Sequence, residues 1–483
     1  QLINLGYQRL LTFEVRGEPG GFSLFGDPPA QMMLTAYGLM EFSDMADVAY
    51  VDPDLMERVA AYLANQQARD GSWSAEGMTI ESGIEDVQSQ LATTAYIAWG
   101  LADAGYEPRA VQRAVRFIER MLRQTPVSET PSSPLTSAVG NAANALPPSA
   151  RRAAVAYDDY TLALVANALI AAGQDAAPLL DVLAARATIA DGLAMWGIGD
   201  MTYLGGYGAT AAIETTALVA QALLRADYRP DLAAQAVDYL IANRDPHGAF
   251  YTTQATVQAL KALALAAQSS EKGAARITIA LTEPSGKITQ RTFTVEAGAA
   301  DVVQQFTFDG IVGDANRLEI AVEGDRTLHY QVVTSYYLPW DAAMTATETA
   351  DPLRVSVTYD RTELQVNETV QALATVELLT PGRAGTVLVD LGVPPGFTPV
   401  TTDLDALVAA GAVDRYELTG RQIIFYLTNV RSGEVEHFTY RLQAKYPIRA
   451  QTPTSQAFDY YAPDQGSIAL PQRIIVTLGT PEK

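Results

Sequence analysis

Four consecutive segments decide the fold of this chain: GGFSLFG (20–26), LTAYGLMEFSDMADV (34–48), LMERVAAYLANQQ (55–67) and DGSWSAEG (70–77). A turn with glycine and an aromatic residue precedes two segments with helical periodicity, and then the same kind of turn returns. The unit recurs further along the chain, at a spacing of roughly 50 residues that is typical of stacked supersecondary units. We therefore expect a repeated pair of helices.

Each recurring turn carries an aromatic residue at a similar position, namely Phe22, Trp73, Trp196 and Phe250. Such aromatics either line the mouth of a helical toroid or plug the junction between two helices, where glycine permits the tight turn. We expect the plug. In each unit one helix is apolar and rich in alanine, whereas the other is amphipathic. An inner and an outer ring of helices, an α/α toroid, fits this alternation.

The periodicity divides the chain into three parts. Residues 1–268 are helical, and the Pro-, Ser- and Thr-rich stretch 124–150 is expected to be an exposed excursion. Beyond a linker at 269–275 the period falls to two, which predicts a small antiparallel β domain at 272–340. Residues 350–480 predict a β-sandwich with one short helix, DLDALVAAG (403–411). Its strands are expected at 354–361, 369–379, 386–393, 422–430, 438–447, 457–463 and 473–478.

Within the small β domain, the expected strands are RITIALT (276–282), RTFTVEAG (291–298), VVQQFTFDG (302–310), RLEIAVEG (317–324) and LHYQVVTSYY (328–337). In the helical part, Asp52 and Pro53 stand where an N-cap and a first-turn proline belong, just before LMERVAAYLANQQ. The first residues, LINLGYQRLLTF (2–13), also predict a helix.

The composition excludes several classes of function. The chain has 33 Lys+Arg and 55 Asp+Glu, a net charge of −22, which repels nucleic acid and anionic membrane. No basic stripe is expected to offset that charge locally, and no nucleic-acid partner is expected. The absence of cysteine removes disulfides and thiolate chemistry. Because the chain opens at Gln1 and shows no signal peptide, we expect it to be the C-terminal part of a longer protein.

Residues with catalytic chemistry are few. The three histidines, His247, His329 and His437, are far apart in sequence, so we expect structural roles for them and no metal site. The acidic pairs Asp158–Asp159 and Glu85–Asp86 are compatible with acid–base work, but we expect them on solvated faces. No phosphate loop, nucleophile elbow or dinucleotide fingerprint is present. We therefore expect no catalytic residue and no cofactor.

The order of segments resembles the alpha-macroglobulin and complement family. GYQRLLTFE (6–14), GGFSLFG, LANQQARDGSW (63–73), LATTAYIAWGL (91–101) and GAFYTTQATVQALKALA (248–264) are similar to its thioester-containing domain. Residues 275–340 look like the C-terminal half of its CUB domain. The last sandwich resembles its receptor-binding domain, through YDRTEL (359–364), VDLGVPPGF (389–397), RYELTGRQIIFYL (415–427), GEVEHFTYRLQAKYP (433–447) and AFDYYAPD (457–464).

The resemblance implies the C-terminal fragment of a broad-spectrum endopeptidase inhibitor, a protease trap that is not an enzyme and that is extracellular (secreted), periplasmic or at the cell surface. Proteases would be partners of the full-length protein, and a cell-surface molecule would be a partner of the sandwich. In the family, an internal thioester between cysteine and glutamine lies upstream of GYQR. This chain has no cysteine, so neither thioester residue is expected here.

Three further expectations follow from the resemblance. Complement-type members carry a histidine in the segment that matches 77–88, but this chain has none there, so transfer to amines is expected. Members cleared by a lipoprotein-type receptor carry two lysines where this chain has Thr401 and Asp405, so that clearance is not expected. The family shields its thioester with aromatics, and the matching residues are Phe25, Tyr460 and Tyr461.

Two rival functions stay open at this point. One is an α/α-toroid enzyme, terpene-cyclase-like or carbohydrate-active, with β appendages. The other is a surface adhesion module that binds through the sandwich. An enzyme should place two or more carboxylates with shifted pKa on the toroid axis, whereas a trap should have an apolar, packed axis.

Overall fold

The computed structural model describes residues 2–23, 26–74, 87–124, 157–197, 202, 206, 208–244, 249–269, 273–296, 304–309, 311, 315–324, 330, 332–334, 352–379, 383–460 and 466–478. The chain divides into two compact units, one with the helices up to residue 269 and a three-stranded sheet, the other with a β-sandwich. Each is described by itself. None of the described helices is both long enough and apolar enough to span a bilayer.

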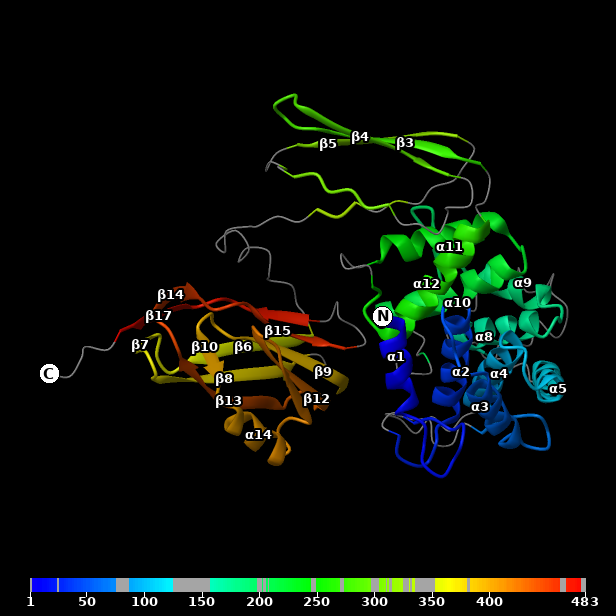
Figure 1. The fold of residues 1–483 in the computed structure, drawn as a ribbon, viewed down its shortest axis with the longest axis horizontal. Helices are drawn as coiled ribbons and strands as arrows, with labels where there is room; N and C mark the ends of the chain where they lie inside the picture. Colours follow the sequence, from blue (N-terminus) through cyan, green and yellow to red (C-terminus); the bar gives the residue numbers. More distant parts are fainter. Residues whose placement is uncertain are drawn as a thin grey trace. The chain divides into compact units, whose positions relative to one another are not determined.

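The helical part alternates two kinds of helix, as predicted (Figure 1). The inner helices α4, α8 and α10 are buried nearly all round, whereas the outer helices α3, α5 and α11 bury one face. The helices are α1 (Leu2–Leu11), α2 (Met32–Ala46), α3 (Pro53–Asn65), α4 (Val87–Asp103), α5 (Pro108–Gln124), α8 (Asp159–Ala171), α9 (Ala177–Arg186), α10 (Gly208–Arg225), α11 (Pro230–Ala242) and α12 (Thr253–Ser269). A hairpin of β1 (Thr188–Ala190) and β2 (Leu193–Met195), which was not predicted, follows α9.

Local signals place the helix ends. At α3 the Asp52 side chain accepts a hydrogen bond from the Asp54 N–H (3.0 Å), and Pro53 is the first helical residue, which confirms both predictions. Asp158 caps α8 in the same way, accepting from the Thr161 N–H (2.7 Å). A short polar side chain thus satisfies an otherwise unpaired N–H at each of these two helix starts.

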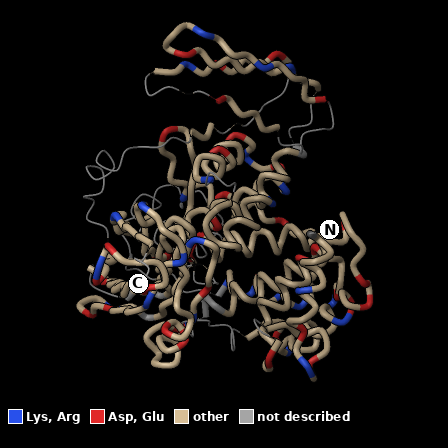
Figure 2. Tube along the Cα trace, turned by 60° about the vertical axis from the view of Figure 1, so that its left-hand side comes forward, with Lys and Arg blue, Asp and Glu red and all other residues tan. Residues whose placement is uncertain are grey.

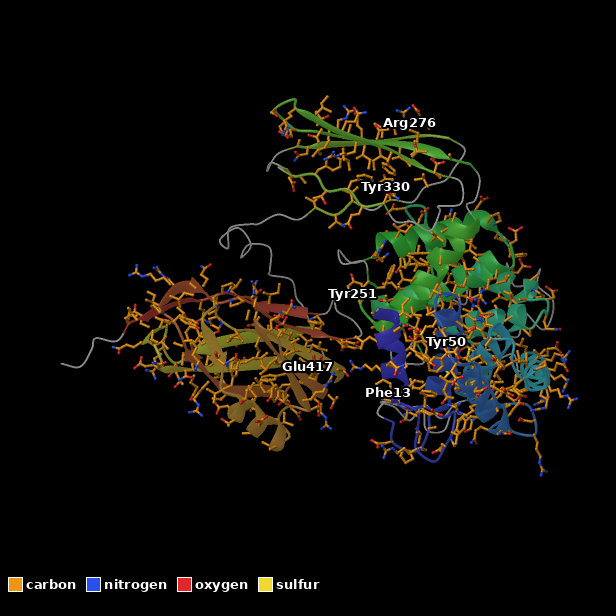
Figure 3. All side chains as sticks on the ribbon, viewed as in Figure 1. Phe13, Tyr50, Tyr251, Arg276, Tyr330 and Glu417 are labelled. Atoms are coloured by element: carbon orange, nitrogen blue, oxygen red, sulfur yellow. The ribbon has the colours of Figure 1, made fainter. Side chains whose placement is uncertain are left out.

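The four turn aromatics are buried, which confirms the prediction that they plug helix junctions. The backbone N–H of each also donates to a threonine hydroxyl on the following inner helix, a contact that the sequence analysis did not predict. These bonds are Phe22 to Thr35 (3.0 Å), Trp73 to Thr94 (3.1 Å), Trp196 to Thr216 (3.0 Å) and Phe250 to Thr256 (2.9 Å). By contrast, Tyr50 and Tyr251, labelled in Figure 3, lie outside these positions and are exposed.

The two turn tryptophans also bind the preceding outer helix. The indole Nε1 of Trp73 donates to the Leu63 carbonyl near the end of α3 (2.7 Å). The indole of Trp196 donates to the Leu183 carbonyl of α9, also at 2.7 Å. Each tryptophan therefore joins the outer helix before the turn to the inner helix after it.

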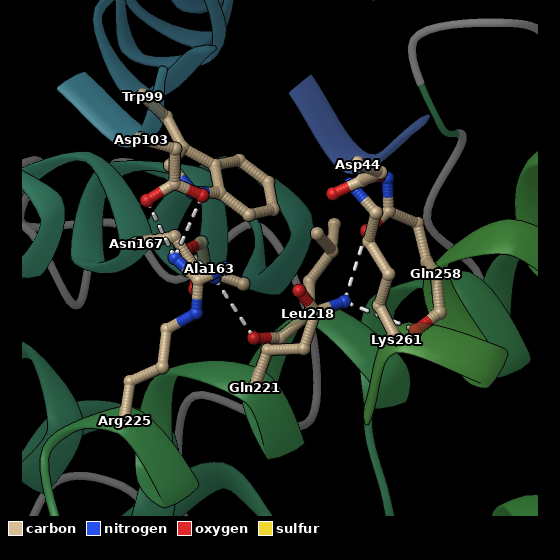
Figure 4. Close-up of polar contacts among 10 residues, drawn as sticks. All are labelled: Asp44, Trp99, Asp103, Ala163, Asn167, Leu218, Gln221, Arg225, Gln258 and Lys261. Carbon is tan, nitrogen blue, oxygen red and sulfur yellow. Dashed lines mark hydrogen bonds and ion pairs between the residues drawn. The ribbon is translucent and has the colours of Figure 1, made fainter. Parts of the chain in front are cut away.

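Polar contacts follow the inner helices around the ring (Figure 4). The Asn167 amide of α8 donates to the Leu218 carbonyl of α10 (2.9 Å), and the Gln221 amide of α10 donates to Gln258 of α12. Lys261 of α12 lies 2.6 Å from the Asp44 carboxylate of α2, and α2 packs on α4, which packs on α8. The inner helices therefore form a closed sequence of neighbours, as a toroid requires.

The β strands after the helices partly match the predictions. β3 (Ala275–Thr282), β4 (Ile288–Val295) and β5 (Arg317–Glu323) form an antiparallel sheet in the order β4-β3-β5. The strand predicted at 302–310 is wrong for residues 304–309, which are not in a strand, although Phe306 stacks on Phe293 (4.5 Å between ring centres). The strand predicted at 328–337 is likewise absent at residues 330 and 332–334.

All seven strands predicted for the sandwich are confirmed, as is the helix α14 (Thr401–Ala409). Its sheets have the orders β10-β13-β8-β6, β11-β12-β9-β15-β16 and β14-β17-β7, around a core that includes Phe425, Phe438 and Tyr440. The predicted strands are β6 (Leu353–Tyr359), β8 (Thr369–Leu378), β9 (Arg383–Gly392), β12 (Gln422–Arg431), β13 (Val435–Ala444), β15 (Ser455–Asp459) and β17 (Arg473–Thr477). Five short strands were missed: β7 (Glu363–Gln365), β10 (Phe397–Pro399), β11 (Arg415–Leu418), β14 (Ile448–Gln451) and β16 (Gly466–Ala469).

Candidate functional site

A group of buried acids and tyrosines lies among the inner helices. It consists of Tyr37 and Glu41 of α2, Tyr96 of α4, Tyr160 of α8 and Glu214 of α10, and is called the acid–tyrosine cluster below. Glu214 is only 3% exposed, and Tyr96 and Tyr160 are also buried. The charges of Glu41 and Glu214 both act on Tyr37 and Tyr96, so one electrostatic environment includes all of them.

Glu214 has the most strongly altered carboxyl of this cluster. Burial raises its pKa from 4.5 to about 7, although hydrogen bonds from the Thr202 and Tyr160 hydroxyls favour the charged form. A tight turn holds Thr202 in place, because its N–H donates to the Gly206 carbonyl (2.7 Å) and its hydroxyl accepts from the Gly206 N–H (3.0 Å). Near neutral pH this carboxyl is therefore divided between its protonated and ionised forms.

Glu41 lies one helical turn after Tyr37, whose hydroxyl hydrogen bonds to it. Burial raises the pKa of Glu41, while the Tyr37 hydrogen bond and the positive charge of Lys261 oppose that shift. Burial also moves the pKa of Tyr37 upward, helped by the neighbouring Glu41. Both tyrosines of α2 and α4 therefore stay neutral and act as hydrogen-bond donors or as packing groups.

The apolar, packed axis expected of a trap is not what the structure shows: two carboxyls with raised pKa lie among the inner helices, as the enzyme alternative expected. Each of these carboxyls already forms hydrogen bonds with hydroxyl groups of the protein itself. Among the described residues no group of His, Asp or Glu has the arrangement of a metal site. The carboxyls of the cluster can stay protonated and hydrogen bonded in the core. Their pKa values are raised mainly by burial.

The pH dependence of stability should report on Glu214. Because its folded pKa lies above its unfolded value of 4.5, the folded state is favoured below pH 4.5, and that contribution is lost as pH rises through about 7. The urea concentration at which the helical part unfolds should therefore be higher at pH 5 than at pH 8. In Glu214→Gln, the difference in the free energy of unfolding between these two pH values should be smaller by up to about 3 kcal/mol. Urea titrations of both proteins at several pH values, followed by circular dichroism, measure this. Identical pH profiles for the two proteins would show that the carboxyl has an ordinary pKa.

The acidic pair Asp158–Asp159 is not on a solvated face, so that prediction is wrong. Asp158 is the N-cap of α8, and burial raises the pKa of its carboxyl. Asp159 forms a largely buried ion pair with Arg186 of α9 (2.7 Å). Both carboxylates thus hold α8 in place. The pair Glu85–Asp86 lies outside the described residues.

The predicted thioester-shielding aromatics are only partly visible. Phe25 and Tyr461 lie outside the described residues. Tyr460 follows β15, is half-buried, and its N–H donates to the Thr386 carbonyl of β9 (2.8 Å). The structure therefore fixes the backbone of Tyr460 to the sandwich, and the shielding role remains a prediction.

The remaining predicted residues have structural or exposed positions. His437 is exposed on β13, opposite Thr375, whereas His247 and His329 lie outside the described residues. Thr401 and Asp405 are exposed on α14, where the Asp405 carboxylate accepts from the Tyr416 hydroxyl (2.7 Å). No lysine stands at either position.

Sequence reasoning missed the acid–tyrosine cluster. A signal for part of it was present, because LTAY (34–37) and TTAY (93–96) place Tyr37 and Tyr96 at equivalent positions of two inner helices. Each tyrosine follows, by two residues, the threonine that binds a turn aromatic. Glu214 precedes the third such threonine, Thr216, by two residues, and only the folded chain shows that its carboxyl reaches Tyr160.

Comparisons with known proteins agree with this architecture. Residues 1–265 match the A-macroglobulin TED domain, and residues 382–470 match the A-macroglobulin receptor binding domain. Ovostatin of Gallus gallus is 24% identical over 487 residues, which cover 96% of this chain and 30% of ovostatin. The chain thus spans less than a third of that relative.

Solved structures show the same fold. The alpha-2-macroglobulin of Escherichia coli, from domain MG7 to the C-terminus, matches 98% of this chain and 67% of that chain, with 13% identity and a TM-score of 0.54. Salmonella alpha-2-macroglobulin reacted with methylamine matches 98% of this chain and 27% of that chain, with 15% identity and a TM-score of 0.57. At these identities the likeness concerns the fold.

Proposed function

This chain belongs to the alpha-macroglobulin family, and from that premise we propose that it is the C-terminal region of a broad-spectrum endopeptidase inhibitor that acts as a protease trap. The observation that carries the proposal is the order of two family domains in one chain, a TED domain at 1–265 and a receptor binding domain at 382–470. The family consists of protease inhibitors and not of enzymes, which argues against the toroid-enzyme alternative.

In this proposal the helical domain spans 1–268, the second half of a CUB domain 272–340, and the receptor-binding sandwich 350–480. Proteases are the partners of the longer protein, which is extracellular or periplasmic. A cell-surface partner of the sandwich would not be the lipoprotein-type receptor, because Thr401 and Asp405 replace the two lysines. Phe25, Tyr460 and Tyr461 are proposed to shield a thioester carbonyl from water, since rigid aromatics exclude water at low entropic cost.

Amines are the proposed acceptors of any thioester in the longer protein. The segment 77–88 has no histidine, and a structural neighbour was solved after reaction with methylamine. This chain has no cysteine, so it contains no thioester of its own. Its proposed contribution is the helical scaffold and the aromatic cover around the bond.

Protease assays with a large and a small substrate distinguish a trap from an active-site inhibitor. The longer protein that contains this chain should slow the cleavage of a large protein substrate by both serine and metalloproteases, while a small peptide substrate is still cleaved at nearly the original rate. The reason is that a trapped protease keeps its active site but loses access to large substrates. This chain alone, as control, should do neither and should not label with methylamine. Equal inhibition of both substrates, or of neither, would contradict the proposal.

A further inference from the structure

The outer helix α5 carries a continuous stripe of arginines. Arg109, Arg113, Arg116, Arg120 and Arg123 follow one another at intervals of four, three, four and three residues. Because 3.5 residues is close to one turn, these five side chains share one face of the helix over about 21 Å. We call them the α5 stripe. The expectation that no basic stripe exists is therefore wrong.

The opposite face of α5 is part of the core. Its buried residues are Ala110, Val111, Ala114, Val115, Phe117, Ile118 and Leu122. Packing therefore fixes the rotation of the helix and turns the α5 stripe away from the core. Arg109, Arg116 and Arg123 are exposed, and Arg113 and Arg120 are partly covered.

The described residues neutralise the α5 stripe only in part. Arg123 pairs with Glu119 (3.0 Å) and Arg120 with Asp70 (3.6 Å), while the guanidinium of Arg113 donates to the Gln67 amide oxygen (2.8 Å). Within the described part of the chain, Arg109 and Arg116 have no carboxylate within ion-pair distance. Like charges three or four residues apart destabilise a helix, so the stripe is kept at a cost to stability.

The repeated architecture provides an internal comparison, because α3, α9 and α11 have the same outer position as α5. Together these three helices carry two basic residues, Arg58 and Arg186. They carry five acidic residues, Asp54, Glu57, Asp181, Asp231 and Asp238. On α5 the balance is five arginines against Glu119 alone. Among the described outer helices, the basic face is therefore a property of α5 and is not shared by the others. In Figure 2 both signs of charge are spread along the rest of the described chain.

We propose that the α5 stripe binds a linear polysaccharide that carries sulfate or carboxylate groups. Guanidinium groups bind such oxyanions with paired hydrogen bonds, and an extended chain can follow a stripe that is one helix wide. A nucleic-acid duplex or a bilayer is wider and would meet flanking acids such as Asp70, on a molecule of net charge −22. A bilayer would also gain no apolar contact, because the apolar face of α5 is already buried.

The test uses the full chain, heparin as the sulfated probe and polygalacturonate as the carboxylated one. Arg109→Gln combined with Arg116→Gln removes two charges that form no ion pair with any described residue. Arg449→Gln combined with Arg473→Gln removes two exposed charges from the sandwich as the matched control. We expect the α5 variant to bind at least tenfold more weakly at low salt, with a shallower dependence of affinity on salt, because fewer counterions are released. The control should bind like the original chain.

Three outcomes would overturn the proposal. The first is no binding of either polysaccharide by the original chain at low salt. The second is equal weakening by the α5 and sandwich variants, which would indicate a diffuse charge effect. The third is binding of duplex DNA, or of vesicles containing anionic lipid, that is as tight as polysaccharide binding and equally sensitive to the α5 variant. Circular dichroism of each variant confirms that the helices are intact.

Discussion

Replacing Trp196 with alanine should lower the free energy of unfolding of the helical domain by about 3–5 kcal/mol. The side chain is fully buried between α9 and α10, so its removal leaves a large cavity. It also removes the indole donor to the Leu183 carbonyl (2.7 Å), which then lies buried without its partner. Urea unfolding followed by the helical circular dichroism signal measures the change.

Trp196→Phe is the matched control for this prediction. It keeps an aromatic ring in the junction but lacks the Nε1 donor, so a smaller loss of about 1–3 kcal/mol is expected. The backbone N–H of residue 196 can still donate to Thr216 in both variants. If Trp196→Ala unfolds at the same urea concentration as the original chain, the tryptophan is not a structural plug and the reading of the turns as junctions fails.

Gly71→Ala should cost about 2–5 kcal/mol through backbone strain and overpacking. Gly71 has φ +96°, and a Cβ there would lie 2.3 Å from the Arg113 carbonyl oxygen, in the backbone of α5. Neither the turn nor a packed helix can shift that far without losing contacts. Thermal and urea unfolding of the full chain measure the effect.

Gly105→Ala is the control, because Gly105 also has a positive φ (+75°) but nothing lies within 4 Å of its added Cβ. Only the conformational strain should remain, about 1–2 kcal/mol. Equal losses at both glycines would mean that close approach to α5 contributes nothing, and that the turn could be built farther from the helix.

The repeat pattern of the helical domain could be predicted because each unit repeats the same physical solution. A turn aromatic, a glycine and two periodic helices are visible in the letters alone. The threonine hydroxyls that accept hydrogen bonds from the backbone N–H groups of the turn aromatics were not predicted. Threonine inside an apolar helix is also an ordinary packing residue. Similarly, Asp158 and Asp159 were predicted to be solvated. The sequence does not show that Asp159 pairs with Arg186 or that Asp158 caps α8.

The β regions show a different limit of prediction from sequence. Long strands with alternating burial, such as β8 and β13, were predicted from their period of two. The missed strands have only three or four residues, too few for an alternation to be recognised. Residues 304–309 have the right alternation but are not in a strand, although their Phe306 stacks on Phe293. Alternation reports which side chains are covered and not whether the backbone finds a partner.

The acid–tyrosine cluster could not have been predicted as a whole, because its members come from four helices spread between Tyr37 and Glu214. Sequence gives no measure of burial for a glutamate within an apolar helix. The apolar axis was the feature expected of a trap as opposed to an enzyme, and it agrees with the general rule that acids avoid cores. Here, hydroxyl groups that hydrogen bond to the buried carboxyls offset the cost of burying them. These partners are recognised only when the helices are assembled.

The double attachment of Trp73 and Trp196 has a consequence for how the domain opens. In an open repeat array each unit contacts its neighbours through a simple interface, so end units can fray one after another. Here the tryptophan between two units is hydrogen bonded to both, through Leu63 and Thr94 in one case and through Leu183 and Thr216 in the other. Releasing one unit therefore breaks hydrogen bonds of the tryptophan that also belongs to the next unit. We expect the turn amides to be as protected from hydrogen exchange as the helical ones. We therefore expect the units joined by a tryptophan to open together and not one after another.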